Sequence, residues 1–330
     1  MKLVTYRSAP TLPPRLGVLQ GDGALLCLTS RHAGDARFSS MAALIAAGED
    51  ALAQARRDAE AHRPGHPHEV PPGGYGLLTP LERPPLMRDW GTMTAHPKFF
   101  LAMRARQRAQ ASPDPAAALE AARQEGLLDL PANWFSVPRF YTANPLNLAG
   151  PGQAIEWPAF AQKLDYELEL AIVLGRTGRD IPQHRARDFI LGVTLFNDFT
   201  ARDVQAAEGQ PAGKSKDFDG AYALGPCIVT LDELPDLYKL RVTSRLNGET
   251  QTVDSTASME IGFEDLIAYA SRSCTLHAGE VFASGTFARG CGVETGRLLQ
   301  PGDRIELEAE HIGILENTIV ASGAALKGGA

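Results

Sequence analysis

Hydrophobic and polar positions near the start of the chain follow a pattern that predicts a β-hairpin and then a helix. Residues 15–28, "RLGVLQGDGALLCL", place two apolar runs on either side of Gly21-Asp22-Gly23, a turn sequence that favours a tight hairpin. Residues 41–63 are predicted to form the helix, with Ser39 or Ser40 as its N-cap.

A stretch rich in proline and glycine follows this helix. Residues 63–74, "RPGHPHEVPPGG", cannot continue a helix, because proline lacks the amide donor and glycine is costly in a helix interior. We place a domain boundary there. The expected organisation is a small N-terminal β-rich domain over residues 1–75 and a second domain over residues 76–330.

The second domain is predicted to be mixed, with strands dominating from about residue 137. "GVTLFND" (192–198) and "IELEA" (305–309) have strand-like patterns, Asn247-Gly248 indicates a hairpin, and "QPGD" (300–303) indicates a turn. The predicted helices lie at residues 97–110, 115–128, 182–190, 200–208 and 263–271. No internal repeat and no regular βαβ rhythm is present, so the pattern favours a mixed α+β fold over a doubly wound parallel sheet.

Composition and charge narrow the function classes. The 330-residue chain is 44% hydrophobic and carries a net charge of -7, which argues against nucleic acid or an anionic membrane surface as the main partner. The apolar runs are too short to span a bilayer, and the first residues lack a run of signal-peptide length, so a cytoplasmic protein is expected. The cysteines form no C-x-x-C pair and are interpreted as buried or idle thiols: Cys27, Cys227, Cys274 and Cys291.

Two glutamates occupy alternate positions of an otherwise apolar strand, "DYELELAIVLG". Glu167 and Glu169 would lie side by side on one face and repel each other unless something neutralises them. Asp198 ends the strand "GVTLFND", and carboxylates at strand ends suit a hard divalent cation. The alternative is that these acids face solvent, which is the usual place for an isolated E-x-E pair.

A helix and a loop that follow Asp198 carry further candidates. Arg202 and Gln205 are three residues apart and share a helix face, which suits binding of an anionic substrate, although a solvated helix with an Arg202–Asp203 pair has the same spacing. Lys214 and Lys216 lie in "GKSKDFDG", which lacks the spacing of a P-loop.

Histidines form two further groups. Asp89 precedes His96 by seven residues in "RDWGTMTAH", a pair that carries no signal by itself because a lone histidine is usually structural. A cluster of His62, His66 and His68 could bind a metal, but it lies in the expected linker, so a metal site there is the weaker interpretation.

Taken together, several stretches resemble the fumarylacetoacetate hydrolase family. They occur in the family's order over roughly residues 80–325, whereas residues 1–75 match only loosely the small N-terminal domain of larger members. The stretches are "LDYELELAIVLG", "FNDFTARDVQ", "GKSKDFDGAYALGP", "RVTSRLNGETQ", "SGTFARGCGVE" and "LQPGDRIELEAEHIGILENTI". The resemblance implies a catalytic β-roll that forms homodimers.

The resemblance also implies roles for individual residues. It makes Asp89, Glu167, Glu169 and Asp198 ligands of a divalent metal, with Mg²⁺ expected and Mn²⁺ or Ca²⁺ as alternatives. The implied catalytic residues are His96, its acidic partner Glu294, Lys216, Arg202 and Gln205. Tyr141 and Thr286 are the implied substrate contacts.

The implied activity is hydrolysis of a C–C bond in a β-diketone acid of the fumarylacetoacetate or acylpyruvate kind. The partner would be a small ketoacid, with the metal acting as Lewis acid and His96 as base for water. Isomerases, decarboxylases and hydratases of aromatic catabolism within the same family remain alternatives, and so does a non-catalytic β-roll that binds a ligand.

Overall fold

The computed structural model describes residues 1–210 and 212–323. Its helices are α1 (Leu28–Arg31), α2 (Met41–Ala47), α3 (Glu49–Ala61), α4 (Ala95–Gln110), α5 (Pro115–Gln124), α6 (Gln183–Ala186), α7 (Arg202–Glu208), α8 (Phe263–Ala270) and α9 (Gly292–Thr295). The strands of the N-terminal half are β1 (Lys2–Arg7), β2 (Arg15–Leu19), β3 (Leu25–Cys27), β4 (Glu69–Val70), β5 (Gly76–Leu77), β6 (Met87–Trp90), β7 (Phe140–Ala143), β8 (Leu148–Ala149), β9 (Ala154–Glu156) and β10 (Leu164–Asp165). The later strands are β11 (Leu168–Leu174), β12 (Ile190–Asp198), β13 (Thr200–Ala201), β14 (Tyr222–Thr230), β15 (Arg241–Leu246), β16 (Glu249–Ser255), β17 (Val281–Ala283), β18 (Arg304–Ala309) and β19 (Gly313–Val320).

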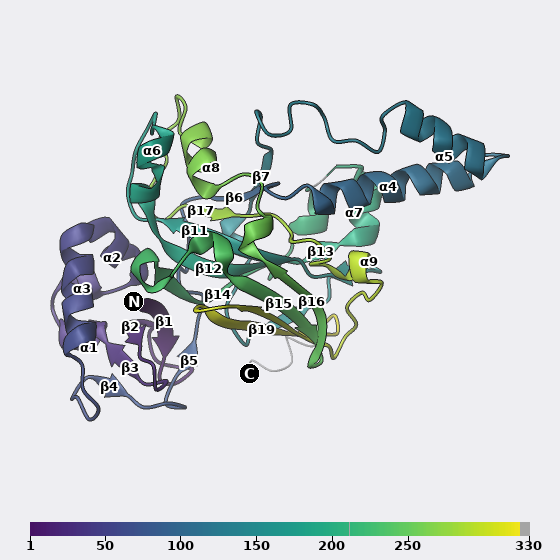
Figure 1. The fold of residues 1–330 in the computed structure, drawn as a ribbon. Helices are drawn as coiled ribbons and strands as arrows, with labels where there is room; N and C mark the ends of the chain where they lie inside the picture. The colour runs from purple at the N-terminus through teal and green to yellow at the C-terminus, as the bar shows by residue number, and fades with distance from the viewer. Residues whose placement is uncertain (211, 324–330) are drawn as a thin grey trace.

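The N-terminal strands β1 to β5 form one end of a long sheet and are flanked by α2 and α3 (Figure 1). The predicted hairpin is confirmed, because β2 and β3 pair antiparallel around the turn. The single helix predicted over residues 41–63 is wrong: Gly48 has φ +72 and separates α2 from α3, a left-handed conformation that ends a helix and that glycine adopts without strain. Ser40 caps α2 by accepting from the Ala43 amide.

One long sheet joins this N-terminal part to the rest of the chain. Its strand order is β4-β3-β2-β1-β14-β12-β11-β17-β6-β7, and β1 pairs antiparallel with β14 at Lys2↔Val229. The proposed boundary near residue 75 stays a prediction. The strands β11, β12 and β14 are buried along their whole length. This part of the sheet therefore lies in the core and holds the side chains at the ends of its strands in fixed positions.

A second sheet, in the order β16-β15-β18-β19-β9, packs against the first through β14 and β19 (Figure 1). The predicted hairpin at Asn247-Gly248 connects β15 to β16, and both turn residues have positive φ. The predicted strands at 192–198 and 305–309 lie within β12 and β18. The fold is therefore mixed α and β, as predicted.

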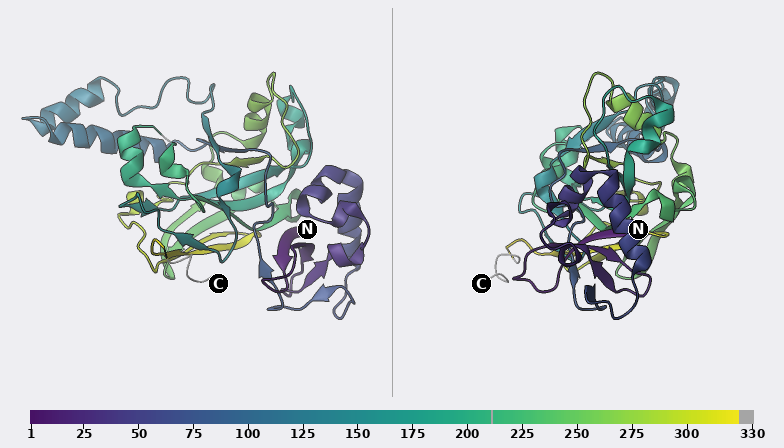
Figure 2. Two further views of the ribbon diagram at one scale, coloured as in Figure 1. Left: turned by 180° about the vertical axis from the view of Figure 1, so that it is seen from behind. Right: turned by 90° about the vertical axis from the view of Figure 1, so that its left-hand side faces the viewer.

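An arm formed by α4 and α5 extends away from both sheets (Figures 1 and 2). It confirms the helices predicted at 97–110 and 115–128, although α5 ends at Gln124. The arm begins directly after β6 and returns to the body at β7. Across the described ranges, no helix combines the length and the apolar character that crossing a membrane requires.

Candidate active site

Three carboxylates meet where neighbouring strands of the long sheet end. Glu169 is the second residue of β11, Asp198 is the last residue of β12, and Asp89 lies on β6 opposite Ala283 of β17. One carboxylate oxygen from each lies within 4.8 Å of the others. The strand pairing β12-β11-β17-β6 thus brings together acids that are far apart in the sequence.

These carboxylates are buried, and their charges are not fully compensated by protein. Asp198 and Glu169 are 0% exposed and Asp89 is 5% exposed. Burial raises the pKa of all three above the ordinary range, and neighbouring negative charges add to the effect. The Oδ1 atoms of Asp89 and Asp198 have no hydrogen-bond partner among the described residues.

This donor set fits a divalent cation. Buried oxygen atoms without partners, in a cluster of acids, are the environment in which Mg²⁺, Mn²⁺ or Ca²⁺ binds. Glu169 is also held in place, since its carboxylate accepts from the Gly285 amide at 3.1 Å and from Thr286 Oγ1 at 3.3 Å. Thr286, a predicted substrate contact, therefore lies next to the cluster.

Glu167 is buried as well, but protein cations neutralise it. Lys216 Nζ lies 2.6 Å from Glu167 Oε2, and Arg202 Nη2 donates to Glu167 Oε1 at 2.8 Å. Burial alone would raise the pKa of Glu167, but Lys216 and then Arg202 outweigh it and hold that pKa well below its usual range. The expectation that isolated E-x-E acids face solvent is wrong for this strand.

Lys216 links Glu167 to the three-carboxylate cluster. Its ammonium group also donates to Asp198, which in turn accepts from the hydroxyl of Tyr141. Burial would lower the pKa of Lys216, but Asp198 and Glu167 raise it above its ordinary value, so the side chain is charged. Lys216 is buried, so its ammonium group lies in the interior beside the carboxylates.

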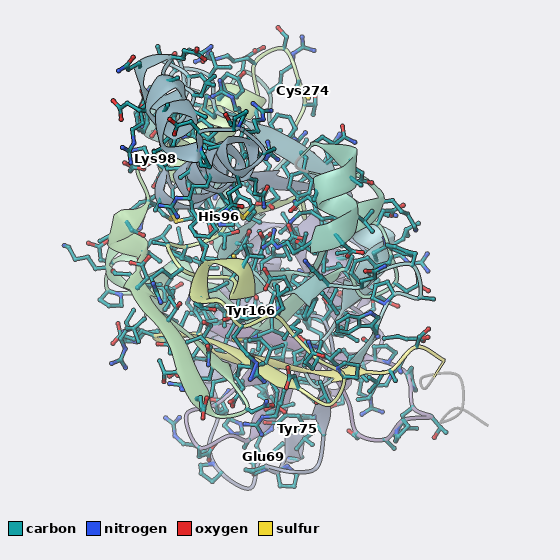
Figure 3. The ribbon with its side chains drawn as sticks, turned by 90° about the vertical axis from the view of Figure 1, so that its right-hand side faces the viewer. Glu69, Tyr75, His96, Lys98, Tyr166 and Cys274 are labelled. Atoms are coloured by element: carbon teal, nitrogen blue, oxygen red, sulfur yellow. The ribbon has the colours of Figure 1, made fainter. Side chains whose placement is uncertain are left out.

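His96 lies in the first turn of α4, at the base of the arm (Figure 3). Its Nε2 is 3.4 Å from Glu167 Oε1, and its Nδ1 is 3.4 Å from Glu294 Oε2. Phe100, one helical turn later, packs edge-on against the imidazole with ring centroids 4.9 Å apart. Burial lowers the pKa of His96, but interactions with Cys291, Glu167 and Glu294 raise it well above its usual value.

The helix α7 positions the remaining polar candidates. Arg202 is its first residue and donates through Nη1 to Gln205 Oε1 at 3.0 Å, as expected for two residues on one helix face. The structure thus brings every residue predicted for the site into one connected network. Their assigned roles as ligands, bases and substrate contacts stay predictions.

Sequence reasoning missed Asp165, which is fully buried. Asp165 accepts from Arg202 Nε at 2.8 Å and from the backbone amides of Gly292 and Val293 at 2.6 and 3.1 Å. It connects the arginine to the segment that carries Glu294. The sequence shows Asp165 at the start of the strand motif "DYELEL". Only the fold shows that the first residues of α9 lie against its carboxylate.

Cys291 was interpreted as a buried or idle thiol and is buried, but its position beside His96 and Glu294 was missed. The thiol is buried, lies 3.4 Å from Glu294 Oε2 and belongs to a second group of potential metal donors with His96 and Glu167. All four cysteines are free, which agrees with the absence of a predicted disulfide framework.

The three histidines of the predicted linker, His62, His66 and His68, lie next to polar side chains of the N-terminal part. His66 Nε2 lies 2.8 Å from Arg31 Nη1, and His68 Nδ1 lies 3.1 Å from Ser30 Oγ. His62 Nε2 is 3.0 Å from Glu69 Oε2. The Arg31 guanidinium group at His66 Nε2 leaves that nitrogen unavailable to a metal ion.

A family model described as the fumarylacetoacetate hydrolase C-terminal region matches residues 108–320. The chain belongs to the fumarylacetoacetate hydrolase family. Relatives include an uncharacterized protein of Archaeoglobus fulgidus, 42% identical over 52% of this chain and 64% of the relative. Another from Staphylococcus epidermidis is 39% identical over 48% of this chain and 52% of the relative. The chain thus spans only about half to two thirds of these relatives.

Solved structures of the family resemble the whole chain. A fumarylacetoacetate hydrolase from Exiguobacterium antarcticum superposes with a TM-score of 0.72 at 28% identity, covering 97% of this chain and 99% of that one. A maleylpyruvate hydrolase from Sphingobium (TM-score 0.71, 20% identity) covers 98% of this chain and 100% of its own. A 2-hydroxyhepta-2,4-diene-1,7-dioate isomerase from Mycobacterium marinum (0.67, 22%) covers 98% and 99%. The last two, named as a hydrolase and as an isomerase, show the fold alone.

Proposed function

We propose that the protein is a metal-dependent hydrolase that cleaves a C–C bond in a β-diketone acid of the fumarylacetoacetate or acylpyruvate kind. The observation that carries the proposal is the position of His96 between Glu167 and Glu294, beside the cluster of Asp89, Glu169 and Asp198. A base flanked by carboxylates next to a candidate cation site suits activation of water.

The carboxylate cluster would hold Mg²⁺ or a similar ion. When bound, the cation supplies a Lewis acid and a template for the oxygen atoms of a ketoacid. Asp89, Glu169 and Asp198 are the residues best placed to hold it, because their oxygens converge and two of them lack protein partners. Glu167 lies against Lys216 and Arg202, and its predicted role as a further ligand is part of the proposal.

His96 would take a proton from water as the water oxygen attacks the distal carbonyl carbon. Glu294, 3.4 Å from Nδ1, would orient the imidazole and stabilise the imidazolium that forms. The pKa of His96 is raised by its neighbours, which favours the protonated ring. A cation held by the nearby carboxylate cluster would oppose this increase in the pKa of His96 and would favour the neutral ring that a general base needs.

Lys216, Arg202 and Gln205 would stabilise the negative charge that develops on the attacked carbonyl oxygen. Lys216 and Arg202 are buried cations in a water-poor interior, where such stabilisation is largest. The C–C bond then breaks, its electron pair passes to the α-carbon as an enolate, and a proton completes the ketoacid product. Tyr141 and Thr286 line the same cluster and would contact the substrate.

The deciding experiment is product analysis by NMR on a small panel of acylpyruvates and fumarylpyruvate with Mg²⁺. The expected products are a free carboxylic acid and a pyruvate-type ketoacid, and their formation should fail in His96→Ala. His184→Ala, which changes an exposed histidine on α6, is the matched control. Release of CO₂ or a shifted double bond from a dicarboxylic ketoacid would instead establish a decarboxylase or isomerase, and no turnover of any substrate would favour a ligand-binding protein.

A further inference from the structure

An open cavity lies between the N-terminal part of the chain and the ends of three strands of the long sheet. Its volume is about 640 Å³, within the range of about 300–1,000 Å³ that is usual for small-molecule sites in proteins. Helix α2 lines one side (Figure 1). The other side is formed by residues from segments 81–85, 175–177 and 277–279, which adjoin β6, β11 and β17.

The cavity is separate from the candidate active site. Gly175 lines the cavity and directly follows β11, whereas Glu169 is the second residue of that strand. The chain between them is extended, so the two ends are about 20 Å apart. No residue predicted for the active site lines the cavity within the described ranges. A molecule bound here would therefore occupy a second site.

The charged and titratable side chains that line the cavity are all basic. They are Arg83, Arg176 and His277, and no acidic residue lines it within the part of the chain that the structure describes. This local excess of cations is opposite in sign to the net charge of -7 of the whole chain. Since a guanidinium group forms paired hydrogen bonds with the oxygens of a carboxylate or phosphate group, two arginines at one cavity suit an anionic ligand.

One acid outside the lining already contacts one of these arginines. Arg176 Nη2 lies 3.2 Å from Glu49 Oε2, and the two side chains are 52% and 62% exposed. Ion pairs that are this exposed are weak. An anion in the cavity can therefore replace Glu49 as the partner of Arg176.

Apolar side chains form much of the remaining lining. Ala42 and Ala46 are four residues apart on α2 and so lie on one face of that helix. Ile45, Leu81 and Pro85 extend the apolar surface, and the first two are also part of the hydrophobic core. A ligand that fills the cavity therefore needs an apolar part in addition to its anionic group.

We propose that this cavity binds a small organic anion. Arg83 and Arg176 hold its carboxylate or phosphate group, His277 offers a further hydrogen-bond donor, and the apolar part of the ligand packs against α2. This site goes beyond the proposed hydrolase function and does not depend on it, because none of its residues has a role in the proposed reaction.

The test is calorimetry of the Mg²⁺-saturated protein with four probes. 2-Naphthoate and 2-naphthyl phosphate carry the two candidate anionic groups on the same apolar rings. 2-Naphthalenemethanol is the neutral counterpart, and inorganic phosphate lacks the apolar part. At least one of the two naphthyl anions should bind about tenfold more tightly than the alcohol and than inorganic phosphate, as expected for contacts to a charged group. The tighter of the two identifies the preferred anionic group.

Variants locate the bound probe. Arg83→Gln and Arg176→Gln should each weaken binding of the tighter naphthyl anion by about tenfold, because each removes a charge-assisted contact. Arg123→Gln is the matched control: Arg123 lies on α5 and, like Arg176, forms an exposed pair with a glutamate, and this variant should bind like the wild type. Ala46→Phe adds a ring at an exposed helix position that lines the cavity, so it should abolish binding while both arginines remain.

Unchanged affinity in Arg83→Gln, Arg176→Gln and Ala46→Phe would show that the probe binds elsewhere and would overturn the site. Equal affinity for the alcohol, equal affinity for inorganic phosphate, or no binding of either naphthyl anion at millimolar concentration would also overturn it. None of these measurements depends on turnover. A failure of the hydrolase proposal therefore leaves the result intact, and loss of this site leaves the hydrolase proposal intact.

Discussion

Replacing Asp165 by asparagine should destabilise the protein more than any other single change of one acid to its amide near the site. Oδ1 of Asp165 accepts from the amides of Tyr166 and Gly292, and Oδ2 accepts from Arg202 Nε and the amide of Val293. Whichever oxygen becomes an amide nitrogen, two donors then face it. Arg202 also loses one of its two buried carboxylates, Glu167 being the other.

The magnitude follows from burial. Asp165 is 0% exposed and Arg202 is 7% exposed, and removing one partner of a buried ion pair typically costs about 3–5 kcal/mol. We therefore expect the free energy of unfolding of Asp165→Asn to fall by about 3–5 kcal/mol. The segment that carries Glu294 should also loosen, because Asp165 holds the amides at the start of α9.

Urea unfolding followed by tryptophan fluorescence measures the change, and hydrogen exchange of the Gly292 and Val293 amides reports the local loosening. Asp203→Asn is the matched control: Asp203 lies one residue after Arg202 and also accepts two backbone amides, but near the surface. Its loss should stay near the 1 kcal/mol of an ordinary hydrogen bond. Equal, small losses in both variants would refute the reasoning from burial.

Four further predictions concern the pH dependence of stability, the metal, the base and the assembly. The pKa of Glu169 in the folded protein lies above its ordinary value of 4.5, so above pH 4.5 the folded state binds more protons than the unfolded state. The melting temperature of the metal-free protein should therefore fall as the pH rises. Added Mg²⁺ should remove this dependence on pH. Asp198→Ala should lose the stabilisation by Mg²⁺, which for the wild type is about 2.7 kcal/mol at a Mg²⁺ concentration of 100 times Kd. If calorimetry shows that the variant binds Mg²⁺ as tightly as the wild type, the ligand assignment is wrong. His96→Ala should lower kcat for an acylpyruvate by about 10²–10⁴ while His184→Ala keeps it, and full activity in the former would exclude His96 as the base. We propose a homodimer, for which light scattering should give about twice 35.4 kDa; a stable monomer at micromolar concentration would refute it.

Local sequence signals predicted the elements that carry the site. The strand ending at Asp198 and the hairpin at Asn247-Gly248 each follow from a pattern of neighbouring residues. The helix predicted over residues 200–208 is also present as α7, but it begins at Arg202 because residues 200 and 201 pair as β13. The break at Gly48 was missed because glycine inside a helical pattern does not reveal its own φ angle, which is +72 here.

The assembly of the site depended on the family resemblance, because it is long-range. Asp89 and Glu169 share no local pattern, and they meet because β17 pairs with β6 on one side and with β11 on the other. Asp165 and Cys291 were missed for the same reason: a loop more than a hundred residues later crosses the start of the strand motif. Their burial, which makes them important, depends on the fold and not on their neighbours in sequence.

His96 lies in the first turn of the long helix that forms one side of the arm. The helix α4 runs without interruption for 16 residues from the turn that contains His96 to the outer end of the arm, a rod of about 24 Å. Figure 2 shows that end standing clear of both sheets. Because the helix is continuous, a tilt of its outer end would also move the imidazole in its first turn. A molecule that binds the outer end of the arm would therefore act on the proposed base from about 24 Å away.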